Sequence, residues 1–164
     1  MITQSRLKEV LSYDKDTGIF IWIKPTSRRV TKNSKAGVIN ASKYVAISID
    51  KKRYAAHRLA WLYVYGKFPD NNIDHIDGNP SNNSIVNLRE ATQQQNLYNT
   101  KKPVTNTSGY KGVHFHKGTK KWRAVVSVNN YPKHLGLFKT LEEAHIAYET
   151  WCIQHRGEFT RIGE

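Results

Sequence analysis

The residues best suited to carry chemistry in this chain lie between positions 74 and 96. Asp74 and His75 are adjacent, an asparagine-rich stretch follows them, and Asn87 and Asn96 come later. Hydrolysis of a phosphodiester bond requires an activated water and neutralisation of the charge that builds on the phosphoryl oxygens. A neutral imidazole suits the first task because its ordinary pKa is about 6.5. His75 is therefore the candidate general base.

The surrounding elements must bring these side chains to one place. Neighbouring residues on a strand point to opposite faces, so Asp74 and His75 can share a site only on a short or twisted strand, or at its end. The residues that follow are turn formers: Gly78, Asn79, Pro80, Asn82 and Asn83. Turn formation explains this loop but does not explain why His75, Asn87 and Asn96 occur together. A helix is expected from about Thr92 to Thr100.

The ordered pattern Asp74-His-Ile-Asp-Gly-Asn79, Asn82-Asn83, Asn87-Leu88 and Asn96 resembles the HNH family of metal-dependent nucleases. The resemblance implies the ββα-metal (His-Me finger) fold, a hairpin followed by a helix with the metal between them. It also implies that Asp74 binds the metal and that Asn87 orients His75 through its other ring nitrogen. Asn96 matches the third position of the family's pattern and would be a second metal ligand.

The ligands that the resemblance implies indicate the kind of metal. An Asp carboxylate and an Asn carbonyl are hard oxygen donors, so one Mg²⁺ or Mn²⁺ ion fits better than Zn²⁺. Members of the family with a second histidine tolerate softer metals, and this chain has Asn96 at that position. With so few protein ligands, DNA phosphate and water must complete the coordination shell. The metal is therefore expected to bind weakly without DNA.

Neighbouring residues have simpler interpretations. Asp77 is expected to cap the turn that follows it rather than bind a second metal. Arg58, near the start of a helix, could reach a DNA phosphate, whereas His57 is expected to pack beside Trp61. Asn99 lies three residues beyond the proposed ligand on the same helix and is expected to face away from the metal.

Composition favours a nucleic-acid partner. The chain has 164 residues, with 26 lysines and arginines against 13 acidic residues, a net charge of +13. Such an excess attracts polyanions. A membrane partner is not expected, because no long apolar run or lipidation motif occurs. The N-terminus lacks a signal-peptide core, so we expect a cytoplasmic protein. Cys152 is the single cysteine, which excludes disulfide frameworks and cysteine-rich zinc sites.

The N-terminal half predicts a mixture of helices and strands. A short helix capped by Thr3 or Ser5 would place Leu7, Val10 and Leu11 on one face. Strands are expected at 19–23, 37–40, 44–49 and 53–56, and a helix at 57–65 with Gly66 as its stop signal. The polar, basic segment 26–35 is either a solvated loop or an arm that contacts phosphate, and the sequence leaves both open. A linker is expected at 100–108.

The C-terminal segment predicts three strands and a helix. Strands are expected at 110–116, 122–128 and 133–138, with a tight turn at Asn129-Asn130. Thr140 and Glu143 form a capping box, and the residues that follow recur at helical spacing: Ala144, Ala147, Tyr148, Trp151 and Cys152. The motifs Gly109-Tyr-Lys-Gly-Val-His114, Lys121-Trp-Arg-Ala124, Leu135-Gly-Leu-Phe138, Glu142-Glu-Ala144 and Ala147-Tyr148 resemble an AP2 DNA-binding domain.

The AP2 resemblance implies a three-stranded sheet in the DNA major groove with a helix behind it. Residues that determine the fold match, but most base-reading positions differ, so the target site does not carry over. The expected DNA contacts in this module are Lys111, His114, His116, Lys121, Arg123, Lys133 and His134. Their lysines and arginine would mainly contact phosphates, unless they simply form a solvated basic face.

Together these patterns predict an α+β protein with an HNH nuclease domain at 1–99, a linker at 100–108 and an AP2-like domain at 109–164. The expected function is that of a metal-dependent endonuclease on double-stranded DNA. It resembles the homing endonucleases of phages and mobile elements. A monomer with one active site would nick DNA, and a dimer on DNA would cut both strands. The alternatives are an inactive HNH scaffold that binds DNA for regulation, and an RNA-directed nuclease or packing protein. A sheet that fits the major groove of B-DNA disfavours RNA.

Overall fold

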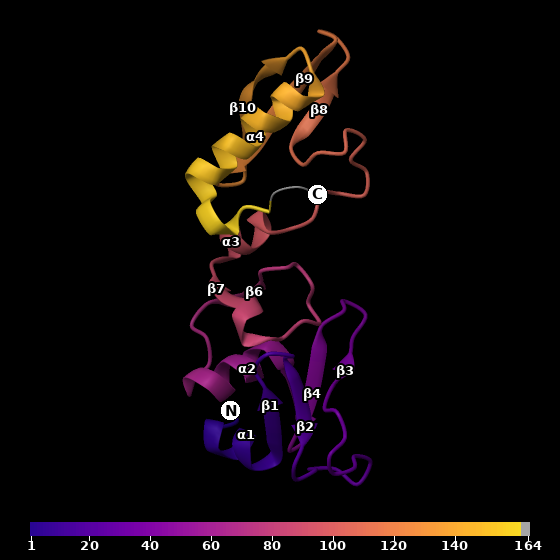
Figure 1. Cartoon of the computed structure of the whole chain (residues 1–164), viewed down its shortest axis with the longest axis vertical. Helices are drawn as coiled ribbons and strands as arrows, with labels where there is room; N and C mark the ends of the chain where they lie inside the picture. The colour runs from indigo at the N-terminus through magenta and orange to yellow at the C-terminus, as the bar shows by residue number, and fades with distance from the viewer. Residues whose placement is uncertain (162–164) are drawn as a thin grey trace. The chain divides into compact units, whose positions relative to one another are not determined.

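The computed structural model describes residues 1–161, and the chain divides into two compact units, Met1–Thr92 and Gln93–Glu164 (Figure 1). The sequence-based domain limit was Asn99, seven residues further along. The difference arises because the helix α3 (Gln93–Tyr98) groups with the second unit. Each unit mixes helices with antiparallel strands, which agrees with the expected α+β class.

The first unit begins with a short helix and a hairpin. α1 (Gln4–Val10) starts at Thr3, whose hydroxyl accepts a hydrogen bond from the Arg6 amide. The expectation that Leu11 belongs to the helix was wrong, because its backbone is extended and it begins β1 (Leu11–Asp14). β1 pairs with β2 (Ile19–Trp22). Leu11 is buried all the same, so the hydrophobic pattern identified a core residue but not its element.

A second sheet follows, in the order β3-β4-β5. Its strands are β3 (Val38–Ile39), β4 (Val45–Ile49) and β5 (Lys52–Ala55). Asp50 and Lys51, between β4 and β5, have φ values of 49° and 63°, as a tight two-residue hairpin turn requires. These three strands were expected from the sequence, and each observed end lies within one residue of the predicted one.

The helix α2 (Ala56–Tyr65) leads from this sheet to the candidate site. It ends where predicted, at Gly66, which has a φ of 78° and donates its amide to the Leu62 carbonyl. Leu59, Ala60 and Leu62 are buried in a core shared with α1 and strands β1, β2 and β4. Beyond the helix, β6 (Asn72–His75) pairs antiparallel with β7 (Leu88–Ala91), and the 3₁₀ turn η1 (Ile85–Asn87) precedes β7.

The second unit contains α3, a three-stranded sheet and a long helix. The strands β8 (Val113–His116), β9 (Lys121–Val128) and β10 (Tyr131–Phe138) form a sheet in the order β10-β9-β8. The helix α4 (Leu141–Arg156) lies across one face of this sheet (Figure 1), and the 3₁₀ turn η2 (Gly157–Phe159) follows it. The predicted capping box is confirmed, because Thr140 accepts from the Glu143 amide and Glu143 accepts from the Thr140 amide. The tight turn at Asn129-Asn130 is also confirmed, by positive φ at both residues.

Candidate active site

The hairpin β6–β7 carries Asp74 and His75 at the end of its first strand. Asp74 is paired in register with Arg89, and His75 with Leu88. The side chains of Asp74 and His75 therefore leave the hairpin on opposite faces. Both residues are buried, with exposed fractions of 3% and 5%. Burying a carboxylate or an imidazole costs free energy unless the group is paired. The partners of Asp74 and His75 therefore define the site.

Arg89 is the partner that the structure gives to Asp74. Its Nη2 and Nε lie 2.8 Å and 2.9 Å from Asp74 Oδ2. The guanidinium is itself largely buried, with 13% of its side chain exposed. Cross-strand neighbours on one face approach closely, so the β6–β7 register itself sets up this ion pair. Sequence analysis did not single out Arg89, although it directly follows the Asn87-Leu88 motif.

His75 is held by Asn83. The His75 Nε2 lies 3.3 Å from Asn83 Oδ1, and the Asn83 amide nitrogen donates to the Ser81 carbonyl at 3.2 Å. The second contact orients the Asn83 amide so that its oxygen faces the ring. Because an amide oxygen only accepts, the neutral His75 ring carries its proton on Nε2 and its lone pair on Nδ1. Burial lowers the pKa of His75, and the Asn83 contact opposes this in part.

Asn87 braces the loop between the two strands. Its side-chain oxygen accepts from the Asp77 amide at 3.0 Å, and its nitrogen donates to Asp77 Oδ1 at 3.0 Å and to the Asn82 carbonyl at 2.9 Å. Asn83 contacts the His75 ring, and the orienting role that the family resemblance assigned to Asn87 remains a prediction. The sequence placed Asn83 in the Asn82-Asn83 pair of the ordered pattern but gave it no role at the ring.

Asp77 caps the turn, as predicted. Its Oδ1 accepts from the Asn79 amide at 2.8 Å, and its Oδ2 accepts from the Asn82 side chain at 2.7 Å. Burial favours a raised pKa for Asp77, but these hydrogen bonds and that from Asn87 lower its pKa overall. The carboxylate thus stays charged and keeps the loop closed over the hairpin.

The turn between β1 and β2 supports the same loop from outside. The Tyr13 hydroxyl donates to the Asn83 carbonyl at 2.7 Å, and the Ser84 hydroxyl donates to the Lys15 carbonyl at 3.1 Å. Gly18 lies against this segment so closely that a Cβ there would stand 2.2 Å from the Ser84 amide nitrogen. The position of Asn83, and through it that of the His75 ring, thus depends on a hairpin some 70 residues earlier.

Replacing Gly18 with alanine is expected to destabilise the first unit by about 2–4 kcal/mol. Gly18 has a φ of 71°, which disfavours a side chain, and the added methyl would also displace the Asn83-Ser84 backbone. Urea unfolding measures the loss. Gly66→Ala is the matched control, because Gly66 also has positive φ but its Cβ would meet only ordinary contacts at 3.7 Å. Equal losses in the two variants would contradict the close-packing argument.

Two rings from other elements flank His75. The centroid of His57, on α2, lies 5.2 Å from that of His75, and the Tyr44 centroid lies 5.8 Å from it, both edge to face. His57 Nδ1 is buried and has no hydrogen-bond partner among the described residues. Burial, followed by the charges of His75 and Arg58, lowers the pKa of His57 to about 4. His57 is therefore neutral at physiological pH.

The lowered pKa of His57 predicts acid sensitivity. The ordinary histidine pKa of 6.5 applies to the unfolded chain and about 4 to the folded one, so the unfolded state binds the proton more tightly. The contribution of neutral His57 to the free energy of unfolding is fully present above about pH 6.5. It falls by about 1.4 kcal/mol per pH unit as the pH is lowered to about 4. Urea unfolding across this range measures the slope. His57→Phe is expected to flatten it in part, since His75 contributes in the same direction. Parallel slopes for wild type and variant would refute this assignment.

Arg58 lies in the first turn of α2, near the helix start where the sequence placed it. Its guanidinium donates to the Pro69 carbonyl at 3.3 Å and lies 5.7 Å from the Phe68 ring centroid. These contacts hold α2 against the turn that enters β6. Its proposed contact with a DNA phosphate remains a prediction, and the structure gives it a local bracing role.

Asn96 lies on α3, within the second unit. α3 is fastened there by its neighbours: the Arg156 guanidinium lies 4.1 Å from the Tyr98 ring centroid, and Gln94 donates to Asn129 at 3.1 Å. The assignment of Asn96 as a metal ligand therefore stays a prediction. Among residues 1–161, no group of three or more His, Cys, Asp or Glu side chains is arranged to hold a metal. A metal at Asp74 would need ligands of other kinds.

Most of the predicted DNA contacts of the second unit share one face of its sheet. Ala124 and Val126 are buried against α4, so the alternate positions point away from the helix. By register, that outer face carries His114, His116, Lys121, Arg123 and His134. His116, Arg123 and His134 line an open hollow of about 460 Å³ there, with Gly136 and Leu137.

Lys111 and Lys133 do not belong to this outer face. Lys133 Nζ lies 5.5 Å from the centroid of Trp151, a residue of α4. Lys111 donates to the carbonyls of Tyr98 and Thr100, at 3.0 Å and 2.6 Å, and burial lowers its pKa to about 8. Its proposed phosphate contact remains a prediction, although the structure shows it tying α3 to the sheet.

Comparison with known proteins agrees with this geometry. Residues 54–98 match the profile of a family described as HNH endonuclease, and this stretch contains α2, the β6–β7 hairpin and α3. The chain is 37% identical to Protein 3.8 of Escherichia phage T7 over 107 residues, which is 65% of this chain and 88% of that protein. The chain thus contains a segment that matches the HNH endonuclease family.

A second relative carries the family's name. The chain is 33% identical to the uncharacterized HNH endonuclease L560 of Acanthamoeba polyphaga mimivirus over 115 residues, which is 69% of this chain and 59% of that protein. No solved structure matches the chain significantly. None of the helices within residues 1–161 is long and apolar enough to span a bilayer.

Proposed function

We propose that this protein is a metal-dependent DNA endonuclease that hydrolyses phosphodiester bonds, and that it acts as a site-directed nickase of the homing type. The observation that carries the proposal is His75, buried next to Asp74, with a ring whose proton is assigned to Nε2 by Asn83. Both residues lie in the segment that matches HNH endonucleases.

The proposed base is His75. With Nε2–H donated to Asn83, its Nδ1 accepts a proton from the water that attacks the phosphorus. In-line attack breaks the bond between phosphorus and the 3′ oxygen, and the leaving oxygen takes a proton from solvent. The products carry 5′-phosphate and 3′-hydroxyl ends. Asn83 acts by holding the ring, and Asn87 by keeping the loop that carries Asn83 in place.

Asp74 and Asn96 would hold one Mg²⁺ or Mn²⁺ ion. Their oxygen atoms suit a hard cation, and the Arg89 guanidinium lies 2.8 Å from the Asp74 carboxylate. When bound, the metal would stabilise the negative charge on the phosphoryl and leaving oxygens. Because Arg89 already interacts with Oδ2 of Asp74, the cation must share this carboxylate. We therefore expect weak metal binding until DNA phosphate adds its own oxygen ligands.

The second unit is the proposed reader of DNA. Its likeness to AP2 domains rests on sequence motifs, and the outer face of its sheet presents cationic and imidazole side chains around one hollow. A twisted sheet of this size fits the major groove. One active site per chain cuts one strand, so a monomer would nick and a dimer on DNA would cut both strands.

A plasmid assay tests the proposal. Supercoiled DNA that carries a candidate target is incubated with the protein in EDTA, Mg²⁺ or Mn²⁺, and the topoisomers are separated on a gel. Open circles that form only with metal support a nicking nuclease, and direct linearisation indicates paired active sites. Bound but uncut plasmid with either metal would favour the alternative, a regulatory DNA-binding protein on an HNH scaffold.

A further inference from the structure

The segment between β2 and β3 concentrates positive charge. Residues 24–37 contain five cationic side chains and no carboxylate: Lys24, Arg28, Arg29, Lys32 and Lys35. Among residues 1–161, Arg28, Arg29 and Lys32 take part in no ion pair, and all three are exposed. Whether this segment is a solvated loop or a phosphate-binding arm depends on how it is held and what surrounds it.

The second half of this segment is anchored by hydrogen bonds to the last residue of β2. The Asn33 amide donates to the Trp22 carbonyl at 2.8 Å, and the Trp22 amide donates to the Ser34 carbonyl at 3.0 Å. In the middle of the segment, Val30 packs against the hydrophobic core. These contacts hold the segment in a defined conformation. In it an apolar side chain points toward the core and the neighbouring cations point to solvent.

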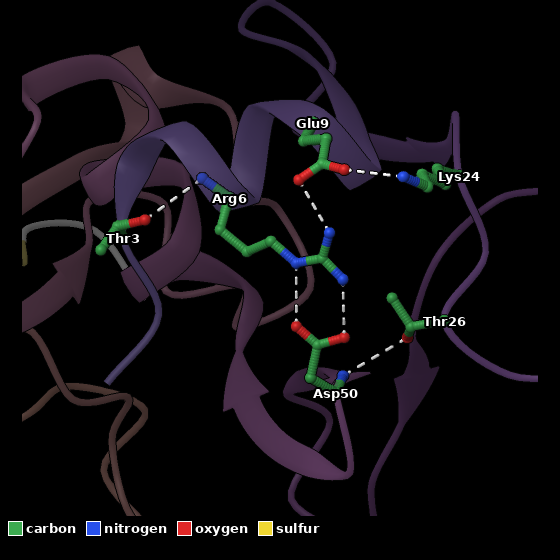
Figure 2. Close-up of polar contacts among 6 residues, drawn as sticks. All are labelled: Thr3, Arg6, Glu9, Lys24, Thr26 and Asp50. Carbon is green, nitrogen blue, oxygen red and sulfur yellow. Dashed lines mark hydrogen bonds and ion pairs between the residues drawn. The ribbon is translucent and has the colours of Figure 1, made fainter.

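A network of exposed ion pairs lies at the base of the segment (Figure 2). Arg6 reaches both oxygens of Asp50, at 2.9 Å and 3.0 Å, and also contacts Glu9 at 2.7 Å. Lys24 reaches the other oxygen of Glu9 at 2.8 Å. Hydrogen bonds from Lys24 and Arg6 lower the pKa of Glu9 to about 2. The Glu9 and Asp50 carboxylates are therefore already paired with Arg6 and Lys24.

The same network links the segment to the β4–β5 turn, next to which lie two further lysines. The Asp50 amide donates to the Thr26 hydroxyl at 3.4 Å (Figure 2), so the β4–β5 turn lies against the base of the segment. Lys51 follows Asp50 in that turn and Lys52 begins β5, and both lysines are exposed. We call Arg28, Arg29, Lys32, Lys51 and Lys52 the basic loop surface. Like charges gathered without counter-ions repel one another, and a bound polyanion would remove that repulsion.

We infer that the basic loop surface binds the phosphate backbone of duplex DNA, as a contact of the nuclease unit separate from the sheet of the second unit. This inference rests on the proposed function for the choice of DNA as the polyanion. Charges on a loop and a turn meet phosphates without reading base edges. The surface therefore contributes affinity and salt dependence but not sequence preference.

The test compares two doubly substituted full-length chains of equal charge. Arg28→Gln/Arg29→Gln removes two cations from the surface, and Lys8→Gln/Lys67→Gln removes two exposed cations elsewhere in the same unit. Fluorescence anisotropy gives the affinity for a duplex from about 50 to about 200 mM salt. We expect the Arg28/Arg29 variant to bind roughly tenfold or more weakly at low salt, and its slope of log affinity against log salt to fall by about two. The lysine control should differ from wild type by less than about twofold.

Equal slopes for wild type and the Arg28/Arg29 variant, or equal losses in both variants, would overturn the inference. Tighter binding of wild type to duplex RNA than to DNA, with the same sensitivity to these substitutions, would also overturn it. Because these outcomes are read from binding, they stand whether or not the protein cuts DNA. If it does cut, the variant should reach the wild-type rate at saturating DNA, which separates this surface from the catalytic residues.

Discussion

Replacing His75 with alanine is expected to lower the rate of DNA cleavage by about 10²–10⁴-fold, the usual contribution of a general base. Affinity for uncut DNA should stay within about twofold of wild type, because His75 is 5% exposed and adds no charge at neutral pH. Single-turnover cleavage at saturating DNA and anisotropy measure the two quantities separately.

Asn83→Ala is the informative companion to His75→Ala. It keeps the imidazole but removes the oxygen that lies 3.3 Å from Nε2, so cleavage should fall by less than in His75→Ala. Circular dichroism and urea unfolding verify that both variants are folded. A large loss of DNA affinity in His75→Ala, or a cleavage rate close to wild type, would rule out His75 as the base.

Replacing Arg89 with methionine is expected to destabilise the first unit by about 3–5 kcal/mol, as loss of one partner from a buried ion pair typically does. Asp74 has an exposed fraction of 3% and would lose the guanidinium that lies 2.8 Å from its carboxylate. The double variant Asp74→Asn/Arg89→Met should recover part of this loss, because the buried charge is removed with its counter-ion. Urea unfolding measures both effects.

Arg6→Met is the matched control for Arg89→Met. Arg6 also bridges acidic side chains, Glu9 and Asp50, but 36% of its side chain is exposed, so its loss should destabilise the first unit much less than the loss of Arg89. If the Arg89 and Arg6 variants lose similar stability, burial does not strengthen the pairing with Asp74. If the double variant is no more stable than Arg89→Met, the Asp74 carboxylate left without Arg89 is not the cause of the loss.

Several elements followed from sequence because local physics decides them. The capping box of Thr140 and Glu143 starts α4, and Gly66 ends α2 in the left-handed conformation that other residues resist. Positive φ at Asn129 and Asn130 makes the tight turn between β9 and β10. Each of these features involves residues that are close in the chain, so their spacing is visible in the sequence.

The sequence allowed the segment that carries the candidate site to be predicted, but not the contacts between its residues. The Asp-His pair, the asparagine-rich loop and the match to HNH endonucleases all lie within one short segment. The sequence does not reveal that Asn83 faces the His75 ring or that Arg89 pairs with Asp74. The first contact depends on the path of a loop, and the second on strand register, which one residue of slip would reverse.

The largest differences arise where distant segments meet. Leu11 fits the apolar face of α1, yet pairing with Trp22 draws it into β1. Lys111 and Lys133 were expected to contact DNA with the outer face of the sheet, yet Lys111 donates to the Tyr98 carbonyl and the exposed Lys133 lies over the Trp151 ring. Thus the sequence by itself determined the α+β composition, the HNH motif and the excess of basic charge, since these depend on residue identity and short spacing. Only the tertiary structure decided which cations are already paired and which asparagine holds the histidine, because those contacts join residues that the chain keeps apart.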